Sequence, residues 1–88
     1  MINGKTKTGF QFSVDENCMN DMELVDILAD DSVDESFRMS ALVKRLLPND
    51  QRKALYDHVR VNGRVPVDAI IMEVESIFDA MGIAGKNS

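Results

Sequence analysis

Apolar and polar residues alternate over one short stretch near the start of the chain. The alternating run is Phe10, Gln11, Phe12, Ser13 and Val14. A period of two is typical of a strand with one buried face, so the sequence predicts a β-hairpin with strands over 2–6 and 10–14 and a tight turn at 7–9. Because a lone hairpin is marginal in water, we expect its phenylalanines to pack on the rest of the domain. The less favoured alternative is an exposed strand edge that adds a partner's strand.

Beyond residue 20 the apolar period lengthens to between three and four residues, which is typical of amphipathic helices. Four such stretches follow one another, each bounded by residues with capping or helix-breaking chemistry. The first helix is expected to begin at a capping box, Asn20–Glu23, and to end near Ala29, and the second to begin at a capping box, Ser32–Glu35, and to end at Pro48. The third is expected to begin at a cap, Asn49, and to stop at Asn62-Gly63, and the fourth to begin with Pro66 in its first turn and to end at Gly82.

The fourth stretch carries the longest apolar stripe, and we expect it to be central to the core. That stripe comprises Ile70, Ile71, Val74, Ile77, Phe78 and Met81. Together these elements predict a mainly α (α+β) fold in which a short N-terminal β-hairpin packs on a compact four-helix domain. Eighty-eight residues are the length of one domain. We expect residues 1–82 to form that single globular domain and 83–88 to form a flexible C-terminal tail.

Charge is segregated along the chain. Residues 15–35 contain nine acids and no Lys or Arg, whereas residues 36–66 contain seven basic residues and two acids. The net charge of −5 disfavours nonspecific attraction to nucleic acid or to an anionic membrane. We interpret the segregation as an internal electrostatic match between neighbouring helices. A helix-turn-helix that presents Arg52, Lys53 and Arg60 to DNA is the less favoured reading, since acidic helices flank the basic block.

Little in the sequence is suited to catalysis or to metal binding. A single cysteine, Cys18, and a single histidine, His58, cannot supply the usual four zinc ligands. We expect His58 to be a half-buried structural residue, because no nucleophile or acid can be assigned beside it. The sequence therefore predicts no enzyme and no cofactor. Without a disulfide, signal peptide or membrane span, the expected location is the cytosol.

Four stretches, taken in order, carry a family resemblance. They are residues 5–15 (KTKTGFQFSVD), 21–30 (DMELVDILAD), 43–48 (VKRLLP) and 63–66 (GRVP) before a helix that ends in Ile77-Phe78-Asp79-Ala80. In these stretches the chain resembles the small tail assembly chaperones of long-tailed phages (siphoviruses) and prophages of Gram-positive bacteria. The resemblance implies a non-enzymatic protein in the cytoplasm of an infected or lysogenic host. It would bind the tape measure protein before tail polymerisation, with the tail tube protein as a further candidate partner.

The basic block supplies the candidate contacts with such a partner. These candidate partner-binding residues are Lys44, Arg45, Arg52, Lys53 and Arg60. Self-association stays open at this stage. A different class also stays open: a small acidic phage-encoded inhibitor that acts on a host or phage protein, with residues 15–35 as its active surface.

Overall fold

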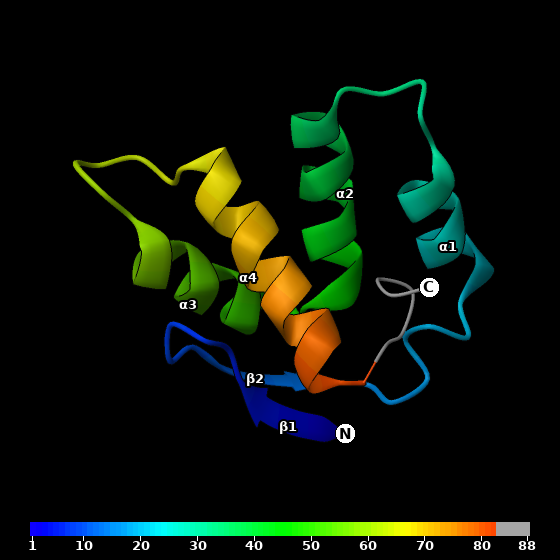
Figure 1. Ribbon diagram of the computed structural model, residues 1–88, viewed down its shortest axis with the longest axis horizontal. Helices are drawn as coiled ribbons and strands as arrows, with labels where there is room; N and C mark the ends of the chain where they lie inside the picture. Colours follow the sequence, from blue (N-terminus) through cyan, green and yellow to red (C-terminus); the bar gives the residue numbers. More distant parts are fainter. Residues whose placement is uncertain (83–88) are drawn as a thin grey trace.

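A two-stranded hairpin and four helices make up the domain in the computed structural model, which describes residues 1–82. The elements are β1 (Ile2–Lys5), β2 (Gln11–Val14), α1 (Met22–Ala29), α2 (Glu35–Leu46), α3 (Asn49–Val59) and α4 (Val67–Ala80) (Figure 1). The predicted α+β class is confirmed. The radius of gyration is 12.5 Å, close to the about 12 Å expected of a compact chain of this length. The tail predicted at 83–88 lies outside the described residues.

The hairpin has the strands and the turn that the sequence predicts, with each strand one residue shorter at the turn. β1 and β2 are antiparallel, with Gly4 opposite Phe12. At the tip the Thr6 N–H donates to the Phe10 carbonyl at 2.8 Å, and the Gly9 N–H donates to the Thr6 carbonyl at 3.0 Å. Gly9 has a φ of 95°, which glycine adopts without steric cost. The result is a three-residue loop whose last residue forms a bulge.

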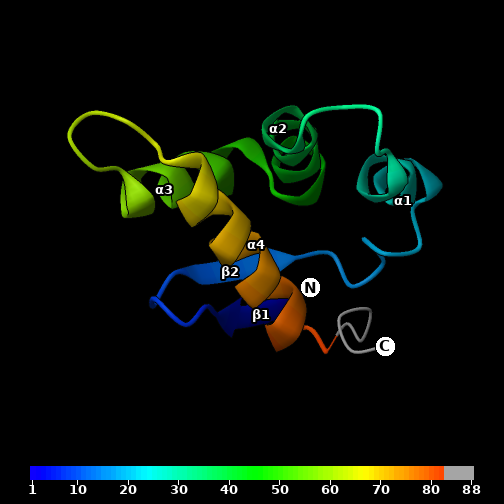
Figure 2. The same ribbon diagram turned by 45° about the horizontal axis from the view of Figure 1, so that its top comes forward.

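The hairpin forms a layer against one side of the helices (Figures 1 and 2). Buried apolar side chains from both layers make one core: Phe10, Phe12, Val14, Leu24, Leu42, Val43, Leu46, Leu47, Leu55, Ile70, Val74 and Ile77. Helix α4 contacts β1, α2 and α3, so its central position follows from the structure as well as from its stripe. Within that stripe Ile77 is fully buried, whereas Phe78 is only half-buried.

Gly4 of β1 lets the ring of Phe12, from the facing strand β2, lie directly against its backbone. A Cβ built at this position would lie 2.6 Å from Cζ of Phe12, closer than real Cβ contacts allow. Phe12 is buried against the core, so its ring has little freedom to move away. The absence of a side chain at Gly4 therefore sets how closely β1 and the ring of Phe12 pack.

All four predicted helix starts are wrong in detail. At the fourth, Pro66 is the N-cap of α4 and not its first helical residue. Helix α1 is capped by Asp21 and not by Asn20, because Asp21 has the extended backbone of a cap and its carboxylate accepts a hydrogen bond from the Glu23 N–H at 3.1 Å. Ser32 does not cap α2; instead its N–H and hydroxyl donate to Asp30, and these bonds lower the pKa of that carboxyl. Asn49 is already the first helical residue of α3. Asn20, Ser32 and Asn49 are all residue types that can cap a helix, but the local backbone conformation decides which residue is the cap.

The junction from α3 to α4 also differs from the prediction. Helix α3 ends at Val59, and Asn62 and Gly63 form the centre of a tight turn with φ values of 53° and 78°. Val61 and Arg64 exchange two backbone hydrogen bonds across this turn, at 2.8 and 3.0 Å. Asn-Gly with two positive φ values is the sequence that such a turn prefers. Asn62-Gly63 therefore reverses the chain direction after α3 and does not form the end of that helix.

Helix α1 lies at the edge of the molecule and packs chiefly on α2 (Figure 1). Of its expected apolar face only Leu24 is fully buried, while Met22 and Leu28 are exposed. A helix of eight residues with a partner on one side can bury only a narrow stripe. No helix within residues 1–82 is both long enough and apolar enough to span a membrane.

Candidate functional site

Arg45 is held in an ion pair with the first turn of α1. Its Nε donates to Asp21 at 2.8 Å, and its Nη2 donates to Asp21 at 3.1 Å and contacts Glu23 at 2.8 Å. The hydrogen bonds from Arg45 lower the pKa of the Asp21 carboxyl. This fork geometry suits a guanidinium and a carboxylate. The positive charge of Arg45 is thus neutralised by these acids, although Arg45 lies in the last turn of α2 as predicted.

A second ion pair joins the acidic stretch to α2. Arg38 donates from Nη1 to the Asp30 carbonyl at 2.7 Å and lies 3.7 Å from the Asp31 carboxylate. With the Arg45 contacts, this pair ties both ends of the α1 region to basic residues of α2. The internal electrostatic match predicted from the sequence is therefore present between these two elements.

The other basic candidates have different surroundings. Arg52 is half-buried: its guanidinium lies 6.0 Å from the centre of the Tyr56 ring and donates to Asn49 at 2.6 Å. Arg60 pairs with Asp57 at 3.1 Å. The five candidates therefore do not form one uniform basic patch.

Two candidate lysines keep an unpaired charge. Lys44 and Lys53 are exposed, and neither has an ion pair with another residue of 1–82. Lys44 lies in the last turn of α2 and Lys53 near the start of α3, with the short Leu47-Pro48 connection between the two helices. The unpaired positive charge of these candidates therefore lies around the α2–α3 junction, and Arg64, in the same basic block, is also exposed.

An apolar groove opens between α2, α3 and the start of α4. It has a volume of about 200 Å³ and is lined by Ser36, Met39, Ser40, Tyr56, Val65, Val67 and Ile70. Val67 is 47% exposed, and Phe37, the neighbour of Ser36 on α2, is 69% exposed. Apolar side chains left in water at a concave site are typical of a protein-binding surface.

Basic side chains flank this groove, whose own lining carries no charge. Lys44 lies one helical turn beyond Ser40 on α2, and Arg52 lies one turn before Tyr56 on α3, with its guanidinium 6.0 Å from the centre of the Tyr56 ring. Arg64 precedes the lining residue Val65. The groove thus has an apolar floor and a surround of both signs, since exposed Glu35 and Asp68 adjoin the lining residues Ser36 and Val67. Sequence reasoning missed the groove because Val65 and Val67 precede the apolar stripe of α4 and only the fold places them beside α2.

His58 belongs to a hydrogen-bonded cluster at the tip of the hairpin. The Thr8 hydroxyl donates to Glu73 at 2.5 Å and lies 2.9 Å from Nε2 of His58. The hydroxyl proton is directed at the carboxylate, so His58 donates to Thr8 and is not placed to act as its base. His58 is exposed, and the prediction that it is half-buried is wrong. The cluster joins the hairpin to α3 and α4.

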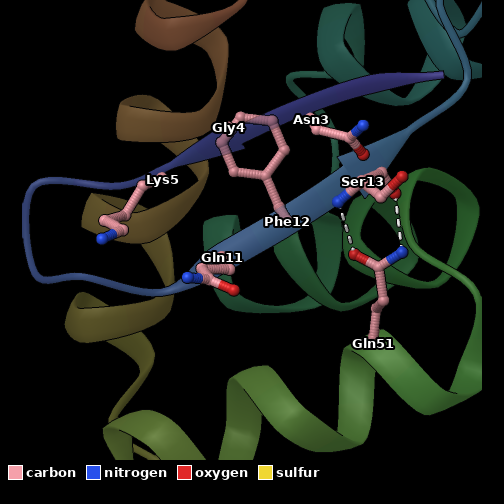
Figure 3. Close-up of a pocket in the computed structure, with 7 residues that line it drawn as sticks. All are labelled: Asn3, Gly4, Lys5, Gln11, Phe12, Ser13 and Gln51. Carbon is pink, nitrogen blue, oxygen red and sulfur yellow. Dashed lines mark hydrogen bonds between the residues drawn. The ribbon is translucent and has the colours of Figure 1, made fainter.

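A second, polar groove lies on the outer face of the hairpin (Figure 3). It has a volume of about 550 Å³ and is lined by Asn3, Gly4, Lys5, Gln11, Phe12, Ser13 and Gln51. Gln51 reaches from α3 to the edge of β2, where its side-chain amide accepts from the Ser13 N–H at 2.8 Å and donates to the Ser13 carbonyl at 2.7 Å. This bidentate contact fixes α3 against the sheet.

Within residues 1–82, no three His, Cys, Asp or Glu side chains are grouped so that they could hold a metal ion. Comparison with known proteins found no match: no family model, no curated protein and no solved structure matches the chain.

Proposed function

We propose that this protein is a non-enzymatic assembly chaperone that holds a helical segment of an unassembled partner protein. The observation that carries the proposal is the apolar groove between α2, α3 and α4, whose lining residue Val67 is 47% exposed. A groove that takes one apolar face of an amphipathic helix is a common mode of peptide recognition. The partner's helix would be covered until it is handed to its assembly.

The size of the groove sets what it can accept. A cavity of about 150 Å³ in another protein holds benzene, so a groove of about 200 Å³ suits one large apolar side chain with part of a neighbour. That corresponds to anchors spaced three or four residues apart on the partner helix. Lys44 and Arg64, which are exposed and lie near lining residues, would attract acidic residues beside those anchors on their side of the groove and would speed encounter.

The resemblance to small tail assembly chaperones gives this partner a proposed identity. It would be the tape measure protein, with the tail tube protein as a further candidate, in the cytoplasm of a bacterium that carries the phage or prophage. A long apolar client needs a covered face and a soluble complex, and the net charge of −5 favours solubility. The acidic inhibitor is the weaker alternative, because Asp21, Glu23 and Asp31 already contact arginines of α2.

The test is co-expression with the tape measure protein encoded by the same phage or prophage. Val67→Asp places a charge in the groove at an exposed helix start, where an acid suits the helix. The matched control is Val61→Asp, since Val61 is 57% exposed and lies in the α3–α4 turn. We expect Val61→Asp to co-purify with the partner and Val67→Asp to lose it, with unchanged melting temperatures.

Two outcomes would count against the proposal. One is a tape measure protein that is equally soluble without this chain and does not co-purify with it. The other is a Val67→Asp variant that captures the partner as well as the control does.

A further inference from the structure

The two outer edges of the hairpin differ in whether their outward backbone groups are hydrogen-bonded. The outer edge of β2 is closed, because Gln51 bonds both the N–H and the carbonyl of Ser13 with its side-chain amide. That amide takes the position which the backbone of a third strand would occupy (Figure 3). An added strand is thereby prevented on this side of the sheet.

The outer edge of β1 has no such hydrogen-bonding cover, although α4 contacts this strand and its residues Ser76, Asp79 and Ala80 share a pocket with Lys5. The bond from Thr6 to Phe10 places the hydrogen-bonded pairs of the ladder at Thr6, Gly4 and Ile2, since these pairs alternate. Asn3 and Lys5 therefore direct their backbone N–H and C=O groups away from β2. Within residues 1–82 no side chain or backbone group bonds to them.

The hairpin itself contributes only positive side-chain charge to this edge, and the acid in the pocket beside Lys5 and Lys7 is Asp79 of α4. Residues 1–14 contain Lys5 and Lys7 and no acid, in a chain whose net charge is −5. The Lys5 side chain is exposed, has no ion-pair partner within residues 1–82, and lines the polar groove beside the edge. A segment that pairs with β1 would meet this ammonium group directly.

We propose that β1 docks an extended acidic segment of a partner protein, which pairs with Asn3 and Lys5 as an added strand and faces Lys5 with a carboxylate. In strand addition the main chain supplies affinity, and alternate side chains supply specificity by entering adjoining pockets. The groove lined by Asn3, Lys5 and Gln11 is that adjoining pocket. With only two outward-facing residues, β1 supports weak binding that supplements another contact. The inference rests on the hairpin alone and does not depend on the helix-binding groove.

The test is a titration of isotope-labelled protein with a capped hexapeptide that alternates valine with threonine and aspartate. We expect the largest amide shifts in NMR spectra at residues 2–5. Lys5→Glu should weaken binding about tenfold because attraction becomes repulsion. Ala54→Glu is the control, since Ala54 is exposed on α3 and has no proposed role in binding, and it should bind within about twofold of the wild type. If Lys5→Glu lowers the melting temperature, Lys5→Gln replaces it in the binding experiment.

Main-chain pairing is tested separately from charge. The same peptide with alternate backbone nitrogens methylated should lose binding, because it lacks the donors that a strand needs. Equal binding of the methylated peptide, or of a single-stranded oligonucleotide of the same charge, would overturn the proposal. So would concentration-dependent dimers that Asn3→Pro abolishes, since a second copy of this chain would then occupy the edge.

Discussion

Replacing Thr8 with valine tests whether the cluster at the hairpin tip stabilises the fold. Glu73 is only 2% exposed. Its Oε2 accepts from the Thr8 hydroxyl at 2.5 Å, and its Oε1 has no hydrogen-bond partner within residues 1–82. Thr8→Val keeps the approximate shape of the side chain and removes that donor. The carboxylate would then remain buried without a protein hydrogen bond.

The expected cost follows from the chemistry of the bond. A hydrogen bond to a charged group contributes about 1.5–3 kcal/mol, and an unsatisfied buried group adds a desolvation penalty. Some water would reach the gap because Thr8 itself is exposed. We therefore expect Thr8→Val to lower the free energy of unfolding by about 2–4 kcal/mol. For a domain of this length the total is about 4–13 kcal/mol, so the loss would be a large fraction of it.

Equilibrium urea denaturation of the wild type, Thr8→Val and Thr8→Ser measures the effect. Thr8→Ser keeps the hydroxyl and should stay within about 1 kcal/mol of the wild type, whereas Thr8→Val should lower the melting temperature by at least about 8 °C. A double-mutant cycle with Glu73→Gln should give a coupling energy of at least about 1 kcal/mol. The reasoning fails if Thr8→Val is as stable as the wild type, or if Thr8→Ser is equally destabilised.

Two further predictions concern packing and acid stability. Gly4→Ala should destabilise the domain by about 1–3 kcal/mol in the same denaturation assay, because the new Cβ would overlap the buried ring of Phe12; an unchanged midpoint would show that the ring moves freely. Arg45 lowers the pKa of Asp21. The pair therefore stabilises the fold at pH values above the ordinary pKa of an aspartate, and this stabilisation is lost as the pH falls through the lowered pKa of the folded state. Arg45→Gln should therefore flatten the fall in melting temperature between about pH 5 and pH 2, and parallel curves for the two proteins would contradict the assignment.

Much of the fold could be predicted from local pattern. The period of two at Phe10–Val14, the helical periods after residue 20 and the breaker Pro48 each depend on neighbours in the chain, and all correspond to observed elements. Helix starts were less predictable, since Asn20 and Asp21 can both cap and the backbone angles at Asp21 decided between them. The basic candidates were found as residues, but pairing separated them: Arg45 faces α1, whereas Lys44 stays unpaired.

The sequence by itself determined the elements, their order and the apolar faces that form the core, because these follow from residue spacing along one strand or one helix. Only the tertiary structure decided that Glu73 is buried, since its donor Thr8 is 65 positions away and meets it when the hairpin packs on α4. The same holds for Gln51 at Ser13 and for the groove that brings Val67 beside α2. In each case the contact joins residues that are distant in the chain, and its formation depends on how the hairpin and helices pack and not on local periodicity.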